Sequence, residues 1–136
     1  MFEFIRKYVR KYPLSTLCIV IIWGLSLTPF FPETPLDNVA FIDKWTHLVM
    51  YGGTCSVIWW EYWRSHTTPD WKKSVFWAWF APIVMSGVLE LLQAYATTTR
   101  NGDWIDLAAN ATGATLGTVI GILLITCFPR RKKDTV

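Results

Sequence analysis

The chain has 136 residues, of which 52% are hydrophobic, nine are tryptophan and 17% are charged, with a formal net charge of +3. This length limits the protein to a single domain, residues 1–136. The basic residues gather in short clusters between long apolar runs. Composition and charge together exclude a disordered chain, a disulfide-stapled secreted module and a nucleic-acid-binding protein, and they indicate a membrane protein.

Four apolar segments approach the length of a membrane span, since about 30 Å of hydrocarbon requires a helix of about 20 residues. The first is short and ends before Pro29. The third contains Pro82 and Gly87, which a membrane helix tolerates when its neighbours satisfy the freed backbone groups. The sequence therefore predicts an all-α, polytopic four-transmembrane-helix bundle, with helices at about residues 14–28, 45–63, 74–96 and 104–128.

Lysine and arginine fall mainly on one side of the predicted membrane. Eleven of the 13 precede the first span, lie between the second and third, or follow the fourth. Short loops rich in these residues stay in the cytoplasm. We therefore expect a multi-pass protein of the cell membrane whose termini are both cytoplasmic and whose loops near residues 30–44 and 97–103 face outward.

Several polar side chains fall within this apolar framework, although a charged group at membrane depth costs about 2.5–3.5 kcal/mol on insertion scales. All lie in the outer halves of three predicted helices or in the adjoining outer loop, and the polar residues of each helix share one face. We expect them to converge into one outward-facing site. Its members are Asp43, Lys44, His47, Tyr51, Glu90, Gln93, Arg100, Asp103, Asp106 and Asn110.

The chemistry of these residue types suggests roles. His47 is the candidate general acid or base, because imidazole exchanges protons near neutral pH. Glu90 or Asp106 would orient it. Lys44 and Arg100 are the candidate partners of a phosphate or carboxylate. Asp43 is a further candidate catalytic residue, and Tyr51, Gln93, Asp103 and Asn110 are further candidate substrate-binding residues.

A small-residue stripe continues the polar face of the fourth helix. Ala109, Gly113, Gly117 and Gly121 repeat every four residues, the spacing that lets one helix backbone approach another closely. The pattern predicts tight packing below the polar cluster, and it does not identify the neighbouring helix.

Structural interpretations of individual polar residues stay open. Asp43 and Asp103 could each cap a helix N-terminus, and His47 could be a hydrogen-bonded core residue. A carboxylate on a membrane helix needs a cation, a shared proton or water. The main structural alternative is therefore an ion pair of Glu90 with Lys44, or of Asp106 with Arg100.

Three groups of residues, in this order, resemble the VanZ-like family of small bacterial membrane proteins. They are Asp43-Lys44-x-x-His47-x-x-x-Tyr51, Glu90-x-x-Gln93, and Arg100 followed by Asp106, Asn110, Gly113 and Gly117. The resemblance covers about residues 43–121. It implies a four-helix protein of the bacterial inner membrane and cell envelope, and the name-giving member is associated with resistance to the glycopeptide antibiotic teicoplanin. Leu48 departs from the family, since many members carry an aromatic residue there.

These observations lead to one main functional hypothesis, in which the outward site binds or modifies an anionic lipid or a lipid-linked cell-envelope intermediate. The alternative is a non-enzymatic lipid transporter, flippase or partner-binding membrane subunit. No cofactor is predicted, although His47 and the carboxylates could hold a divalent cation. The predicted partners are membrane lipids and an amphipathic substrate, with no nucleic acid, and a homo-oligomer could supply what one chain lacks for transport.

Overall fold

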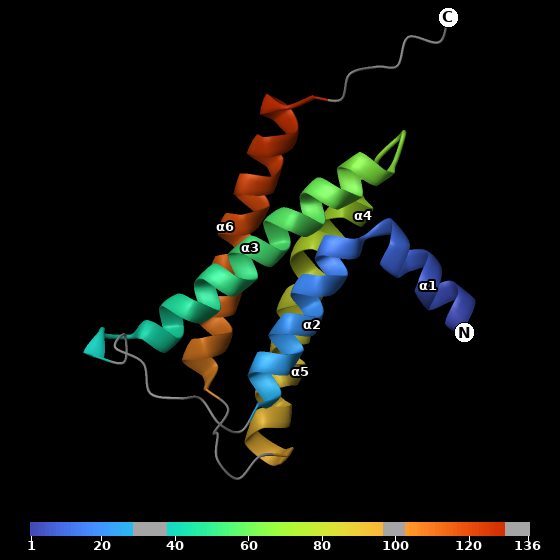
Figure 1. Cartoon of the computed structure of the whole chain (residues 1–136). Coiled ribbons are helices and arrows are strands. Elements are labelled where there is room, and N and C mark those ends of the chain that lie inside the picture. The colour runs from blue at the N-terminus through green and yellow to red at the C-terminus, as the bar shows by residue number, and fades with distance from the viewer. Residues whose placement is uncertain (29–37, 97–102, 130–136) are drawn as a thin grey trace, which may run out of the picture.

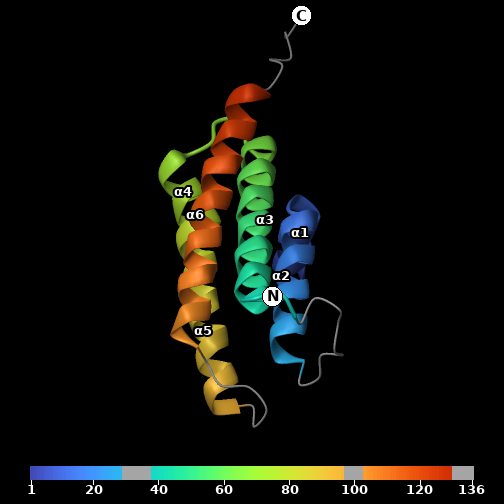
Figure 2. The same cartoon turned by 90° about the vertical axis from the view of Figure 1, so that its left-hand side faces the viewer.

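The structure is a computed structural model, and it describes residues 1–28, 38–96 and 103–129. Within these ranges the regular structure is entirely helical (Figure 1). The long helical segments lie along one another and alternate in direction, as a second view also shows (Figure 2). In chain order the elements are α1 (Phe2–Lys11), α2 (Pro13–Leu27), α3 (Ile42–Ser65), α4 (Trp71–Val75), η2 (Phe76–Phe80), α5 (Ala81–Ala96) and α6 (Trp104–Cys127).

The four predicted helical segments are all present. They correspond to α2, α3, the continuous run of α4, η2 and α5, and α6, and each end lies within three residues of its predicted position. The pattern of apolar segments does not predict α1, because residues 2–11 are too few and too charged to span a bilayer. This helix leaves the bundle at an angle to α2 (Figure 1).

The third segment contains a π-helical turn, η2, directly before Pro82. In a regular α-helix the ring of a proline clashes with the carbonyl four residues earlier. A π-helical turn is wider than an α-helical one, so it gives the ring room, and the helix then continues to Ala96. The expectation that Pro82 does not end this helix is confirmed.

Helices α3 and α6 pack most closely, along the predicted stripe of small residues. Gly113 lies against the backbone of Leu48 and Gly117 against that of Gly52, so a Cβ on either α6 glycine would overlap main-chain atoms. Ser56 Oγ lies 2.8 Å from the carbonyl oxygen of Gly52 and 3.0 Å from that of Gly117. This contact, which we call the glycine seam, confirms the predicted close approach and identifies α3 as the neighbour.

Two helical segments are long and apolar enough to cross a membrane, by length and composition: Trp71–Tyr95 and Trp104–Cys127. In the most apolar stretch of each, only 28% is buried. Most of their apolar side chains therefore face away from the bundle. Helix α2 is also apolar, but shorter.

The two ends of the bundle carry different polar groups. The N-terminal ends of α3 and α6 meet at what we call the Lys44 end, and the opposite end, where α2 begins and α3 finishes, is the Glu61 end (Figure 1). There the buried carboxylate of Glu61 accepts hydrogen bonds from the backbone N–H groups of Leu14 (2.9 Å) and Ser15 (2.8 Å) and from the Ser15 hydroxyl (2.6 Å). Glu61 thus caps the N-terminus of α2 from α3 and holds the two helices together.

Candidate functional site

Lys44, in the first turn of α3, is surrounded by three carboxylates. Its Nζ lies 2.7 Å from Asp43 Oδ2, 3.0 Å from Asp103 Oδ2 and 2.5 Å from Asp106 Oδ1. Asp103 is in reach because it caps the N-terminus of α6, where its other oxygen accepts the Ile105 N–H (2.8 Å). The glycine seam brings the two helix starts together. We call Asp43, Lys44, Asp103 and Asp106 the Lys44 cluster.

The charges of this cluster stabilise one another, and Asp43, Lys44 and Asp103 lie outside the predicted spans. The hydrogen bond from Lys44 holds the pKa of Asp43 below its ordinary value. The pKa of Asp103 is also lowered, first by the hydrogen bond from the Ile105 N–H and then by Lys44. In return, the hydrogen bonds to Asp106 and Asp43 raise the pKa of Lys44. Asp43, Asp103 and Lys44 are therefore charged at neutral pH.

A chain of polar contacts leads from the cluster into the bundle through His47. The Nε2 atom of His47 lies 3.8 Å from Asp106 Oδ2, and its Nδ1 atom lies 3.0 Å from Asn110 Oδ1. Asn110 is 1% exposed, and its amide nitrogen donates to Ser86 Oγ on α5 (2.7 Å). Because Asn110 presents its oxygen to the imidazole, Nδ1 of His47 carries a hydrogen and Nε2 faces the carboxylate.

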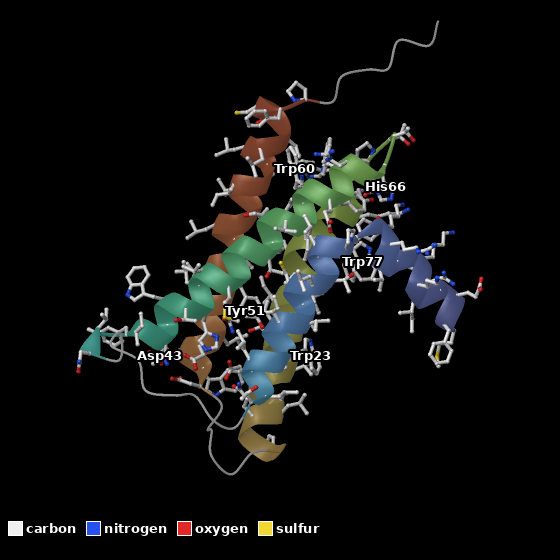
Figure 3. All side chains as sticks on the ribbon, viewed as in Figure 1. Trp23, Asp43, Tyr51, Trp60, His66 and Trp77 are labelled. Carbon is white, nitrogen blue, oxygen red and sulfur yellow. The ribbon has the colours of Figure 1, made fainter. Side chains whose placement is uncertain are left out.

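Tyr51 lies at the inner end of this chain. It is hydrogen-bonded to Ser86, is 2% exposed, and packs in the apolar core with Ile22 and Leu89. Figure 3 shows it further along α3 than Asp43, toward the middle of the bundle. Among the described residues, Ser86, Asn110 and His47 link Tyr51 to the Lys44 cluster.

Helix α5 contributes Glu90 and Gln93 to the same end. The Oε2 atom of Glu90 accepts the backbone N–H of Asp103 (3.0 Å), which joins α5 to the cap of α6. Gln93 Nε2 donates to the carbonyl oxygen of Ser26 (2.7 Å), which joins α5 to α2. Both side chains are buried, and together with the ion pairs of Lys44 between α3 and the start of α6 these contacts hold all four long segments together at the Lys44 end.

A small pocket of about 150 Å³ opens between α5 and α6 beside these groups. Glu90 and Asp103 provide its polar part. Its remaining walls are mostly apolar: Gly87, Leu91, Ala94, Tyr95, Trp104 and Leu107. A carboxylate-bearing pocket with apolar walls fits an amphipathic ligand better than a fully polar one.

Most of the predicted site is brought together by the fold. Arg100 lies outside the described residues. Ser86 was not predicted, although it lies four residues before Glu90 and therefore extends the polar face of α5. The predicted residues that converge at the Lys44 end are Asp43, Lys44, His47, Glu90, Asp103, Asp106 and Asn110, with Tyr51 and Gln93 at its margins.

The structural interpretations of the polar residues, as helix caps or as ion pairs, have different outcomes. Asp103 as a helix cap is confirmed. Asp43 is not a cap, because Phe41 occupies that position and Asp43 lies within the first turn of α3. Lys44 forms ion pairs with aspartates of α3 and α6, and not with Glu90 as one alternative proposed. The proposed pair of Asp106 with Arg100 involves a residue outside the described ranges.

Neither metal ligation nor similarity to known proteins identifies the site. Among the residues that the structure describes, no group of three or more His, Cys, Asp or Glu side chains is arranged so that it could hold a metal ion. No family model, curated protein or solved structure matches the chain. The resemblance to the VanZ-like family therefore rests on the order of polar residues in the sequence.

Proposed function

We propose that this chain is a four-span, VanZ-like membrane protein of the bacterial envelope, with both termini in the cytoplasm and the Lys44 end facing outward. Its site binds or modifies an amphipathic anionic lipid or a lipid-linked cell-envelope intermediate. The family resemblance adds a proposed link to glycopeptide resistance. Each part of this proposal has separate support.

The membrane location is supported by where the apolar and basic side chains lie. Two segments have the length and composition of spans, and their apolar side chains are largely uncovered. Lys11 ends α1, Arg64 lies in the last turn of α3, and Lys72 and Lys73 lie in α4, so these basic residues gather at the Glu61 end. Because basic residues mark the cytoplasmic side, this end would face the cytoplasm.

The placement of His47 between Asp106 and Asn110 carries the functional proposal. Asn110 fixes the imidazole ring, and Nε2 faces a carboxylate. This arrangement can take a proton from a headgroup hydroxyl or amine and return it to a leaving group. Buried polar groups are costly and often less stabilising than apolar packing, so a network contributed by three helices favours a chemical role over a structural one.

The geometry refines the role of Lys44. Its ammonium is already paired with three carboxylates, so we assign Lys44 to organising the cluster rather than to capturing the anion of the substrate. Arg100 is the remaining candidate for that task on the grounds of sequence. The pocket beside Glu90 supplies apolar walls against which a lipid chain can lie.

The decisive experiment compares membrane lipids by mass spectrometry in cells that express the wild-type protein, His47→Gln or Thr46→Ala. Thr46 is the neighbouring exposed residue, and its hydroxyl donates to the Ile42 carbonyl within its own helix. We expect a headgroup change with the wild type and Thr46→Ala, and a reduction of about 100-fold or more with His47→Gln, the usual contribution of a general acid or base.

Three results would contradict this proposal or a part of it. An unchanged headgroup effect in His47→Gln at equal membrane levels would remove His47 from the chemistry. An altered distribution of lipids between the leaflets, without new lipid species, would favour the alternative of a transporter or flippase. Extraction of the protein by alkaline carbonate would contradict the membrane location itself.

A further inference from the structure

A second pocket lies at the Glu61 end, far from the Lys44 cluster. It has a volume of about 420 Å³ and lies between α1, α2, α3 and the α4–η2 segment. Figure 3 labels two of its lining residues, His66 and Trp77, on the side of the bundle where α1 leaves α2. The proposed function does not use this pocket.

The polar part of this pocket is cationic. Lys11 of α1 and Lys73 of α4 both line it, and Lys11 Nζ lies 3.1 Å from Nε2 of His66. Among the described residues, none that lines the pocket is an aspartate or glutamate. The nearest buried acid on α3, Glu61, already accepts three hydrogen bonds from the start of α2. The pocket therefore favours an anionic group.

A row of aromatic rings forms one wall. Ring centroids lie 4.6 Å apart for Phe4 and Tyr8, 6.3 Å for Tyr8 and Tyr12, 6.3 Å for Tyr12 and His66, and 4.3 Å for Tyr62 and His66. The row connects the exposed helix α1 to α3. Rings that are apolar on their faces and polar at their tips suit the boundary between lipid headgroups and chains.

Helix α1 is amphipathic, and its apolar side is uncovered. Phe2, Phe4 and Ile5 are all exposed, while the same helix carries four basic residues. A helix of this composition lies in the plane of a membrane surface and is attracted to anionic lipids. Since α1 leads directly into the pocket, a lipid at that surface has access to Lys11.

The inner part of the pocket is apolar. Ile19 of α2, Ile58 of α3 and Trp77 of η2 line it, and Trp77 is itself exposed. A ligand that fills the pocket would therefore meet cations at one end and apolar side chains at the other. Its volume lies within the range of about 300–1,000 Å³ that is usual for small-molecule sites.

We propose that this pocket binds the phosphate headgroup of an anionic phospholipid from the adjacent leaflet, with Lys11 and Lys73 contacting the phosphate and an acyl chain lying along Ile19, Ile58 and Trp77. The proposal rests on the membrane location in the proposed function, but it does not involve the Lys44 cluster or His47. It assigns the Glu61 end a lipid site of its own.

The test uses the full-length protein in phosphatidylcholine bilayers that contain a small fraction of phosphatidylglycerol, with bromine on the chains of one lipid or the other. Bromine quenches nearby tryptophan, and the difference between the wild type and Trp77→Phe isolates the signal of Trp77. We expect brominated phosphatidylglycerol to quench Trp77 preferentially. Quenching of Trp77 by brominated phosphatidylglycerol that is no greater than the share of this lipid in the bilayer would overturn the proposal without any reference to a charge variant.

Two double variants then separate the pocket from general surface charge. Lys11→Gln with Lys73→Gln should lower the preference for phosphatidylglycerol about tenfold or more, because each substitution removes a charge-assisted hydrogen bond to the phosphate, which contributes about a factor of ten. Lys7→Gln with Lys72→Gln removes the same charge from the same two helices, but neither residue lines the pocket. This control should keep most of the preference, and Lys11→Arg with Lys73→Arg should retain it.

The remaining outcomes also decide the matter. Equal losses in the two glutamine double variants would show that charge alone, and not the pocket, selects the lipid. If glycerol 1-phosphate abolished the Trp77 preference as effectively as excess phosphatidylglycerol, the ligand would be a soluble phosphate and the lipid assignment would be wrong. If Trp77 showed no preference for phosphatidylglycerol while His47→Gln lost the headgroup change as expected, only the proposed lipid pocket would be overturned. Failure of the protein to insert into bilayers would overturn both proposals.

Discussion

The two ends of the bundle each bury a glutamate, and they use it differently. At the Glu61 end, the carboxylate accepts three hydrogen bonds from the start of α2, at 2.6–2.9 Å. At the Lys44 end, Glu90 accepts the backbone N–H of Asp103 at 3.0 Å and lies beside a pocket. A buried acid whose oxygens are fully used by a helix terminus is structural. One that faces a pocket within a polar network is a candidate for chemistry.

The same contrast applies to the positive charges. At the Lys44 end, Lys44 is enclosed by three aspartates. At the Glu61 end, Lys73 and Lys11 line a pocket that carries no acidic side chain among its described residues. The Lys44 end is therefore suited to exchanging protons, and the Glu61 end to holding an anion. The following predictions test this division.

The largest expected effect on stability is that of Glu61→Gln. The substitution keeps the size of the side chain but places an amide N–H₂ against backbone donors, so at least one N–H at the start of α2 loses its acceptor. We expect a loss of about 3 kcal/mol in unfolding free energy, because hydrogen bonds to charged groups contribute about 1.5–3 kcal/mol each and unsatisfied buried donors add to the cost. Thermal unfolding in detergent would measure it.

Glu90→Gln is the matched variant at the other end. Its amide oxygen can still accept the Asp103 N–H, so we expect a loss of less than about 1 kcal/mol. The headgroup change expected with the wild type should nevertheless disappear. A stability loss equal to that of Glu61→Gln, together with retained function, would remove the distinction between the two acids.

An effect on stability between those of Glu61→Gln and Glu90→Gln is expected at the glycine seam, which connects the two ends. In Gly117→Ala the new methyl group meets the backbone of Gly52, which cannot move aside as a flexible side chain could. Overpacking of this kind costs about 1–3 kcal/mol. Gly53→Ala is the control, because a Cβ there meets nothing within 4 Å. Equal unfolding temperatures for the two variants would contradict a tight seam.

The smallest effect should appear in the acid dependence of stability. The folded-state pKa values of Asp43 and Asp103 are lowered, so their contribution is fully present above the unfolded values near 4 and is lost as the pH falls through the folded values. Stability should therefore change little between pH 5 and 7 and fall below about pH 4. Lys44→Met should show a weaker fall in acid-unfolding measurements, and an unchanged acid dependence would contradict the ion pairs.

Much of the fold could be predicted, because apolar length and helical periodicity are local properties of the chain. They located the four helical segments, the polar faces and the close approach along Gly113 and Gly117. The neighbour of that stripe could not be predicted, since the spacing describes one surface and not its partner. The role of Glu61 was missed for the same reason: its partners, Leu14 and Ser15, are 46 or 47 residues away in the chain.

The sequence predicted which residues gather at the candidate site more successfully than it predicted which of them contact one another. The carboxylates and His47 converge as expected, but the three-way pairing of Lys44 depends on Asp103 capping α6, and helix caps fix positions that periodicity does not. Ser86 was overlooked because a lone serine on an apolar helix carries no charge to attract notice. Tyr51, by contrast, was expected to contact substrate and lies in the core.

The glycine seam also constrains how the polar end can respond to a ligand. Because main-chain atoms of α3 and α6 touch there, the distances among Lys44, Asp106 and His47 are set by a rigid two-helix unit. Any widening of the neighbouring pocket must then come from displacement of α5, whose Glu90 lines the pocket and accepts the Asp103 N–H. Ligand size would be selected by how far one helix can tilt, while the spacing of the proton-exchanging groups stays constant.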